Sequence, residues 1–147
     1  MIPKFRAWIK EEKCFAEYIE SIRYYSKEID LCWGGVCESD CFDFEGIELM
    51  QSTGLKDKNG KEIFEGDILQ IDYIKAIVRF GQYRYYDSAG KDVLIGNGFY
   101  LECLNVMNPD CISPYETDVL DKAEIIGNIY ENPEYNRNLV GFRIKGE

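Results

Sequence analysis

Three cysteines close together in the chain, Cys32, Cys37 and Cys41, form the group best suited to metal chemistry. Thiolates are favoured zinc ligands, and the glycines between the first two would let the loop bend around an ion. Their spacing differs from that of a CxxC knuckle, so they are weak metal candidates, and we predict no metal and no other cofactor. Redox chemistry and simple free thiols are the alternatives. A fourth ligand would have to come from the remaining cysteines, Cys14, Cys103 and Cys111.

The chain contains no histidine, which removes the most usual general base and a favoured metal ligand. Carboxylate pairs such as Glu62 with Glu65, or Glu65 with Asp67, would serve acid/base chemistry only if a cleft raised the pKa of one partner. Among 27 acidic residues, close pairs are expected by chance. We therefore predict that the protein has no catalytic residues and is not an enzyme.

The sequence is acidic, with a formal net charge of −10. This charge repels phosphate groups, so it disfavours nucleic acid and anionic membranes as partners. A nucleic-acid-associated β-barrel module stays open as an alternative, because tyrosine and arginine side chains can stack on single-stranded bases. Another alternative is an acidic surface that imitates nucleic acid and binds a basic host protein. The candidate stacking patch comprises Arg79, Tyr83, Arg84, Tyr85 and Tyr86.

At 147 residues, the chain is long enough to bury a core without disulfides. Its N-terminal region is basic and has no apolar run of signal-peptide length. No stretch reaches the roughly 18 uncharged apolar residues that a membrane-spanning helix needs. We expect a cytoplasmic protein with reduced cysteines.

Short β-strand patterns dominate the sequence. Phe5, Ala7 and Ile9 alternate with polar or larger residues, which predicts a strand and a first hairpin with residues 14–19. The dipeptides Asn59-Gly60 and Asn97-Gly98 are each expected to form a hairpin turn. Loops are expected at residues 34–41 and 108–118, and the best helix candidate is residues 119–123, capped by Asp118. Further strands are expected at 21–25, 29–33, 42–51, 68–73, 76–80, 93–95, 99–104 and 124–130.

These short strands, with turn signals roughly every 8 to 12 residues, predict a mainly β protein with little helix. The expected fold is a small antiparallel β-barrel or sandwich built from hairpins. We divide it into an N-terminal hairpin lobe at residues 1–52, a central barrel-like lobe at 53–135, and a C-terminal tail or edge strand at 136–147. One continuous domain is the alternative.

Residues 53–69 contain Gly54, Gly60 and Gly66 at intervals of six, which suits chain reversals. Asp57 and Asp67 can accept hydrogen bonds from nearby backbone amides, so turn structure explains the segment well. The alternative is a charged interaction loop that touches a partner. That candidate loop comprises Lys56, Asp57, Lys58, Asn59 and Lys61.

The sequence TGLKDKNGKEIFEGDIL at residues 53–69 resembles the YopX-like family of phage and prophage proteins. KFRAW at 4–8, AIVRFG at 76–81 and EIIGNIYENP at 124–133 agree with the same family, in the same order. The resemblance implies a β-rich fold, a phage or prophage origin in a bacterial host, and self-association. It implies no activity and supplies no catalytic residues. Residues 32–43 and the tail after residue 135 depart from the family pattern.

The predicted function is therefore that of a non-enzymatic phage or prophage accessory protein that works through protein contacts. We expect a homo-oligomer formed by exposed β edges or aromatic patches. A host or phage protein is a further candidate partner.

Overall fold

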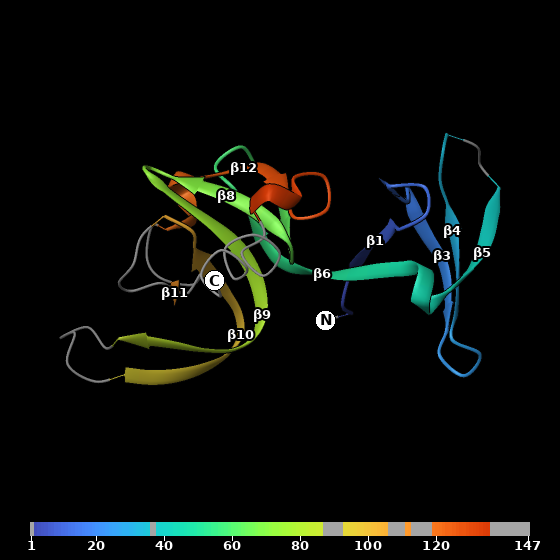
Figure 1. Cartoon of the computed structure of the whole chain (residues 1–147), viewed down its shortest axis with the longest axis horizontal. Helices are drawn as coiled ribbons and strands as arrows, with labels where there is room; N and C mark the ends of the chain where they lie inside the picture. Colours follow the sequence, from blue (N-terminus) through green and yellow to red (C-terminus); the bar gives the residue numbers. More distant parts are fainter. Residues whose placement is uncertain (1, 36–37, 87–92, 106–110, 113–118, 136–147) are drawn as a thin grey trace, which may run out of the picture. The chain divides into compact units, whose positions relative to one another are not determined.

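The computed structural model describes residues 2–35, 38–86, 93–105, 111–112 and 119–135, and these are mostly antiparallel β-strands. The chain divides into two compact units, Met1–Ser52 and Thr53–Glu147 (Figure 1). The predicted tail at residues 136–147 lies outside the described residues. The mainly β fold class with little helix is confirmed.

The first unit holds two sheets. In one, β1 pairs antiparallel with β2 on one side and with β6 on the other. The predicted first hairpin is confirmed, but its second strand ends at Phe15, and residues 18–19 of the predicted strand belong to β3. In the other, β4 lies between β3 and β5. The elements are β1 (Phe5–Ile9), β2 (Cys14–Phe15), β3 (Tyr18–Arg23), β4 (Glu28–Cys32), β5 (Ser39–Asp43), the 3-10 helix η1 (Phe44–Gly46) and β6 (Ile47–Lys56), which continues into the second unit.

The core of this unit follows from the alternation of its strands. Ile29 and Leu31 of β4 are fully buried and pack with Ala7, Ile9 and Ile47. Because neighbouring side chains in a strand point to opposite faces, Glu28 and Asp30 of β4 lie on the outer face of the sheet. That outer face carries the polar groups described below.

The second unit is built on a curled, half-barrel sheet with the strand order β11-β10-β9-β8-β12. The strands predicted at 68–73 and 76–80 are confirmed as an antiparallel pair, β8 with β9, whose turn lies at residues 72–73. The elements are β7 (Glu62–Phe64), which pairs with β6, then β8 (Asp67–Ile71), β9 (Ile74–Tyr86), β10 (Val93–Cys103), β11 (Cys111–Ile112), η2 (Leu120–Lys122), β12 (Ala123–Asn128) and η3 (Pro133–Tyr135).

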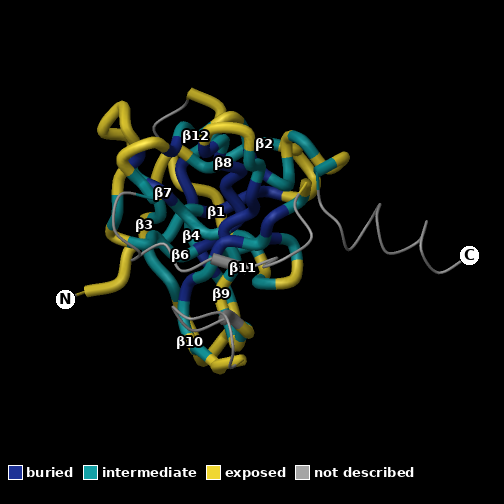
Figure 2. The backbone as a smooth tube through the Cα atoms, turned by 90° about the vertical axis from the view of Figure 1, so that its left-hand side faces the viewer, coloured by how far each residue is buried: buried dark blue, intermediate teal, exposed yellow. Residues whose placement is uncertain are grey.

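A buried apolar cluster packs against this sheet. In both units the strand centres are buried and most turns are exposed (Figure 2). The buried members of the cluster are Ile63, Leu69, Ile71, Ala76, Val78, Phe99, Leu101 and Ala123.

The two predicted hairpin turns have different outcomes. Asn59-Gly60 does lie in the turn between β6 and β7, with Gly60 at a φ of 81°. The prediction for Asn97-Gly98 is wrong, because both residues lie inside β10 and pair with β9. Gly98 and its partner Gly81 have φ values of 129° and 149°. Here the freedom of glycine serves a bend in two long strands, and pairing with β9 overrides the local turn preference.

Three smaller predictions also need correction. Cys111–Ile112 forms a short strand, β11, within the predicted loop at 108–118. The predicted helix at 119–123 is only a 3-10 turn at Leu120–Lys122, and its expected cap Asp118 lies outside the described residues. The loop predicted at 34–41 is shorter, because β5 begins at Ser39, where the backbone pairs with β4.

Candidate functional site

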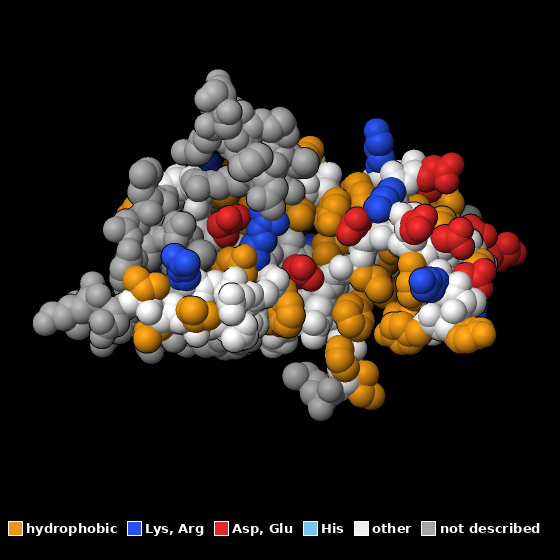
Figure 3. Space-filling model, turned by 60° about the horizontal axis from the view of Figure 1, so that its bottom comes forward, with side chains coloured by type: hydrophobic (Ala, Val, Ile, Leu, Met, Phe, Trp, Pro, Cys, Tyr) orange, Lys and Arg blue, Asp and Glu red, His pale blue; other side chains and the backbone are white. Residues whose placement is uncertain are grey.

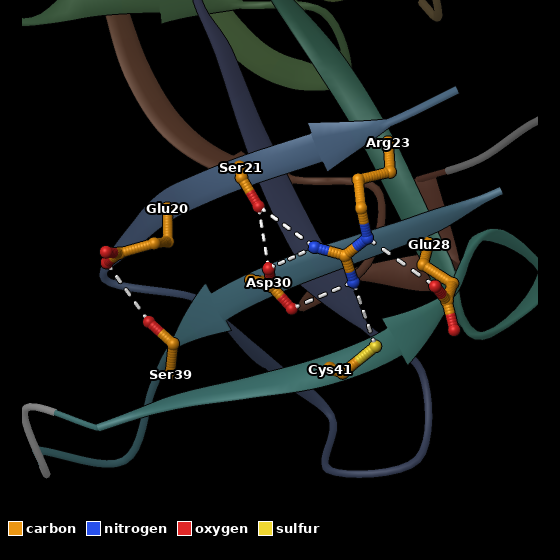
Figure 4. Close-up of polar contacts among 7 residues, drawn as sticks. All are labelled: Glu20, Ser21, Arg23, Glu28, Asp30, Ser39 and Cys41. Atoms are coloured by element: carbon orange, nitrogen blue, oxygen red, sulfur yellow. Dashed lines mark hydrogen bonds and ion pairs between the residues drawn. The ribbon is translucent and has the colours of Figure 1, made fainter. Parts of the chain in front are cut away.

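A group of interacting polar side chains lies on the outer face of the β3-β4-β5 sheet (Figure 4). The register places Asp30 of β4 between Ser21 of β3 and Cys41 of β5, and places Glu28 opposite Arg23. These residues share one face because each lies directly across from its partner or two positions along the strand. We call these five residues the arginine cluster.

Arg23 is the centre of the arginine cluster. Its Nη1 and Nη2 atoms donate to the two carboxylate oxygens of Asp30 at 2.5 and 3.2 Å. The same nitrogens also donate to Ser21 Oγ and Cys41 Sγ, each at 3.3 Å. Its Nε atom lies 3.5 Å from Glu28 Oε1. The guanidinium is therefore occupied by groups from all three strands, and little of it remains to hold an anionic ligand.

These contacts set the protonation of the group. The hydrogen bonds from Arg23 and then from Ser21 lower the pKa of Asp30 to about 2. The same bond to Asp30 raises the pKa of Arg23 above its ordinary value. Desolvation, followed by the negative charge of Glu28, raises the pKa of the Cys41 thiol, although Arg23 acts in the opposite direction.

The arginine cluster is poorly suited to catalysis. A carboxylate with a pKa near 2 is a weak base at neutral pH, and Ser21 Oγ donates to Asp30 Oδ2 at 2.6 Å. A thiol with a raised pKa stays protonated and is a poor nucleophile. The arrangement instead links β3, β4 and β5 to one another by charge-assisted hydrogen bonds.

The pKa of Asp30 provides a direct test of this geometry. Because its folded pKa is below the ordinary value, its contribution to stability is complete above about pH 4 and is lost as the pH falls through about 2. A titration of the carboxyl carbon by NMR should give a midpoint near 2 in the wild type. Arg23→Gln should return it toward the ordinary value, whereas Lys27→Gln, with the same charge change in the same hairpin, should not. An ordinary midpoint in the wild type would contradict the geometry.

The predicted interaction loop is held by one buried carboxylate. Asp57 is 6% exposed, and its Oδ1 accepts hydrogen bonds from the backbone amides of Asn59 and Lys61, both at 2.9 Å. Its Oδ2 accepts from the amide of Ile125 in β12 at 3.0 Å. Asp57 thus has a structural role. The exposed members of the loop, which remain candidates for partner contact, are Lys56, Lys58, Asn59 and Lys61.

The predicted stacking patch is divided by the β9–β10 register. Arg79 forms an ion pair of 3.1 Å with Glu102, and Tyr83 stacks on Tyr100 with ring centroids 4.9 Å apart. Alternation places Arg84 on the opposite face from Arg79 and Tyr83. Tyr85 and Tyr86 continue β9. A single platform for bases is therefore disfavoured, and nucleic-acid binding stays an untested alternative.

Beyond the core, β9 and β10 continue as a curved two-stranded ribbon (Figure 1). We call residues 81–86 with 93–98 the arm. Val93, Leu94 and Ile95 of the arm are 53%, 41% and 61% exposed, and Phe80 at its base is 54% exposed. Figure 3 shows apolar side chains, in orange, among polar ones on the face of the molecule that it draws. Exposed apolar side chains on a projecting element are typical of surfaces that contact other proteins.

The remaining predicted groups are not brought together into a site. Asp67 is buried, and its Oδ2 accepts a hydrogen bond from the amide of Phe64 at 2.8 Å. Cys32 is buried in β4, Cys41 lies on β5, and Cys37 is outside the described residues. The three cysteines therefore stay untested as weak candidates for a metal site. Within the described part of the chain, no three Cys, Asp or Glu side chains group as metal ligands. No helix there is long and apolar enough to cross a membrane.

Sequence reasoning missed the arginine cluster. Its signal was present as alternating polar residues at 21, 23, 28 and 30, which a hairpin with the correct register would have joined. It also missed the arm, because Asn97-Gly98 was assigned to a turn.

Comparison with known proteins agrees with this architecture. The family model described as YopX protein matches residues 4–135. The crystal structure of protein EF1440 from Enterococcus faecalis is 32% identical, covering 91% of this chain and 97% of that chain, with a TM-score of 0.54. No curated protein matches the chain. Because the family match takes in both units, including the Asp57 turn and β12, this chain belongs to the YopX family.

Proposed function

We propose that this protein is a non-enzymatic accessory protein of phage or prophage origin. It acts in the cytoplasm of a bacterial host through protein contacts, and it associates with itself. The observation that carries the proposal is the arm, a two-stranded ribbon with three neighbouring exposed apolar residues. An isolated two-stranded ribbon is marginally stable in water, so burial against another chain would stabilise it.

The chemistry of the described residues supports a role in binding. In the arginine cluster, the lowered pKa keeps the carboxylate of Asp30 ionised, and the raised pKa keeps the thiol of Cys41 protonated. The sequence also has no histidine to act as a base near neutral pH. A phage or host protein remains a second candidate partner for the same surface.

Light scattering coupled to size exclusion, over a wide range of loading concentrations, tests self-association. The wild type should show a mass that rises with concentration. Leu94→Ser should shift the rise to higher concentration, whereas Tyr25→Ser should not, although Tyr25 is 102% exposed in the β3–β4 turn. A constant monomer mass at every concentration would contradict self-association.

A further inference from the structure

The arm has an outer backbone edge with no described partner strand. β11 pairs with β10 only at Leu101 and Glu102, which lie beyond the arm. From residue 93 to residue 98, β10 is paired on one side with β9, and no strand in the described residues pairs with its other side. In an antiparallel strand, alternate amides and carbonyls point toward each neighbour, so half of these groups face outward.

The β9 side of the arm also has no described partner strand, because β8 pairs with β9 only as far as Ile77, but this side carries the charged Arg84. Several other sheet edges of the described fold have features that block pairing with another chain. β12 has a bulge between Ile125 and Gly127, and Glu124 precedes it. β3 has an irregularity between Ile19 and Ser21. β5 carries charged residues, and β2, β7 and β11 are only two or three residues long. Bulges, charges and shortness are the usual protections of an edge strand.

The β10 edge lacks these protections. Residues 93–98 read Val-Leu-Ile-Gly-Asn-Gly, with no charge and no proline, and their register with β9 is continuous. Val93 and Ile95 are β-branched residues that favour strands, and an exposed, uncharged strand edge pairs readily with another strand. The edge of β10 at residues 93–98 is therefore able to pair with a further strand.

The charge of the arm favours a second copy of this acidic chain as the partner. Among residues 81–86 and 93–98, Arg84 is the single charged residue, and its sign is opposite to the net charge of −10. Two acidic copies would repel each other least here. An antiparallel edge is also self-complementary, because a two-fold axis pairs a strand with its own copy.

We propose that two copies of the chain join through β10, edge to edge and antiparallel, so that their arms form one continuous four-stranded ribbon. This inference rests on the self-association proposed above and gives it a geometry. Six residues of strand are about 20 Å long, and a sheet is about 10 Å thick. An edge-to-edge contact of this length therefore buries about 200 Å² on each copy. That is well below the roughly 800 Å² of a standard interface. The exposed apolar side chains must contribute as well, and the association should be weak and reversible.

Amide hydrogen exchange followed by NMR tests the geometry. With a dissociation constant of about 50 µM, the fraction of monomer falls about fivefold when the protein concentration rises from about 10 µM to about 1 mM. Exchange should slow by the same factor at the alternate amides within 93–98 that face away from β9. The intervening amides, which face β9, should change far less. Ile95→Lys should abolish the concentration dependence. Ile126→Lys, at an exposed isoleucine of β12 on the opposite edge of the same sheet, should leave it unchanged.

The outcomes separate this inference from the proposed function. If the wild type stays monomeric at about 1 mM, both self-association and β10 pairing are overturned. If it assembles without new protection at residues 93–98, or if Ile126→Lys dissociates it and Ile95→Lys does not, only the β10 geometry is overturned. Circular dichroism confirms that each variant is folded before its result is used.

Discussion

Asp57→Ala is expected to lower the free energy of unfolding of the second unit by about 3 kcal/mol. The substitution removes the acceptor for three backbone amides, those of Asn59, Lys61 and Ile125, at a site that is 6% exposed. Amides left without a partner in a buried place cost more than the net value of the bonds themselves. Because one of them belongs to β12, the turn should be held less firmly to that strand, although the amide of Lys58 still donates to the carbonyl of Ala123.

Chemical denaturation of the variant measures this loss. Asp121→Ala is the matched control, since it removes an exposed carboxylate from the same unit and should change the stability by less than about 0.5 kcal/mol. Asp57→Asn should have an intermediate effect, because the amide keeps one acceptor oxygen and presents an N–H group to the amide of Ile125. Equal stability of Asp57→Ala and the wild type would contradict the structural role.

The same carboxylate predicts a dependence on pH. Burial alone would raise the pKa of Asp57, but the amides of Ile125, Lys61 and Asn59, aided by the charge of Lys61, outweigh it and lower the pKa. A lowered folded pKa gives stability that is complete above about pH 4 and is lost as the pH falls through the folded value. The acid loss of stability should therefore be shallower in Asp57→Asn than in the wild type.

The Asp57 turn shows which part of such a site a sequence can predict. Its bonds to Asn59 and Lys61 are local, and the pattern Asp-x-Asn-Gly-Lys indicates them. Its bond to Ile125 joins residues 68 positions apart, and no local pattern encodes that contact. The sequence thus predicts the turn, whereas the attachment of the turn to β12 comes from the tertiary fold.

The arginine cluster and the arm were missed for related reasons. Arg23 lies opposite Glu28 only because the intervening turn places Lys27 at a φ of 59°, which residue preferences do not predict. In the arm, Asn97-Gly98 has a strong local preference for a turn, yet the two residues pair with Gln82 and Gly81. By contrast, the β8–β9 hairpin has clear alternation on both strands, so local and tertiary preferences agree.

Gly127→Ala is expected to destabilise the second unit by about 2 kcal/mol, through a clash with the turn that follows β12. A Cβ atom at this position would overlap Asn132 Oδ1 and lie 3.0 Å from its Cγ. That Oδ1 accepts the amide of Asn128 at 3.2 Å. Asn128 in turn is 5% exposed, and its Oδ1 accepts the amides of Tyr130 and Glu131. Displacing Asn132 would therefore disturb a buried hydrogen-bonded turn.

A double-mutant cycle with Asn132→Ala isolates the clash. Asn132→Ala removes the overlapping atoms, and the alanine Cβ would lie 3.7 Å from the new methyl group, which is ordinary van der Waals contact. Gly127→Ala should therefore cost much less in this background than in the wild type, giving a coupling energy of about 1 kcal/mol or more by chemical denaturation. Additive losses would show that the cost arises from the backbone of the β12 bulge instead of from contact with Asn132. Gly46→Ala, where a Cβ meets no atom within 4 Å, controls for the substitution itself.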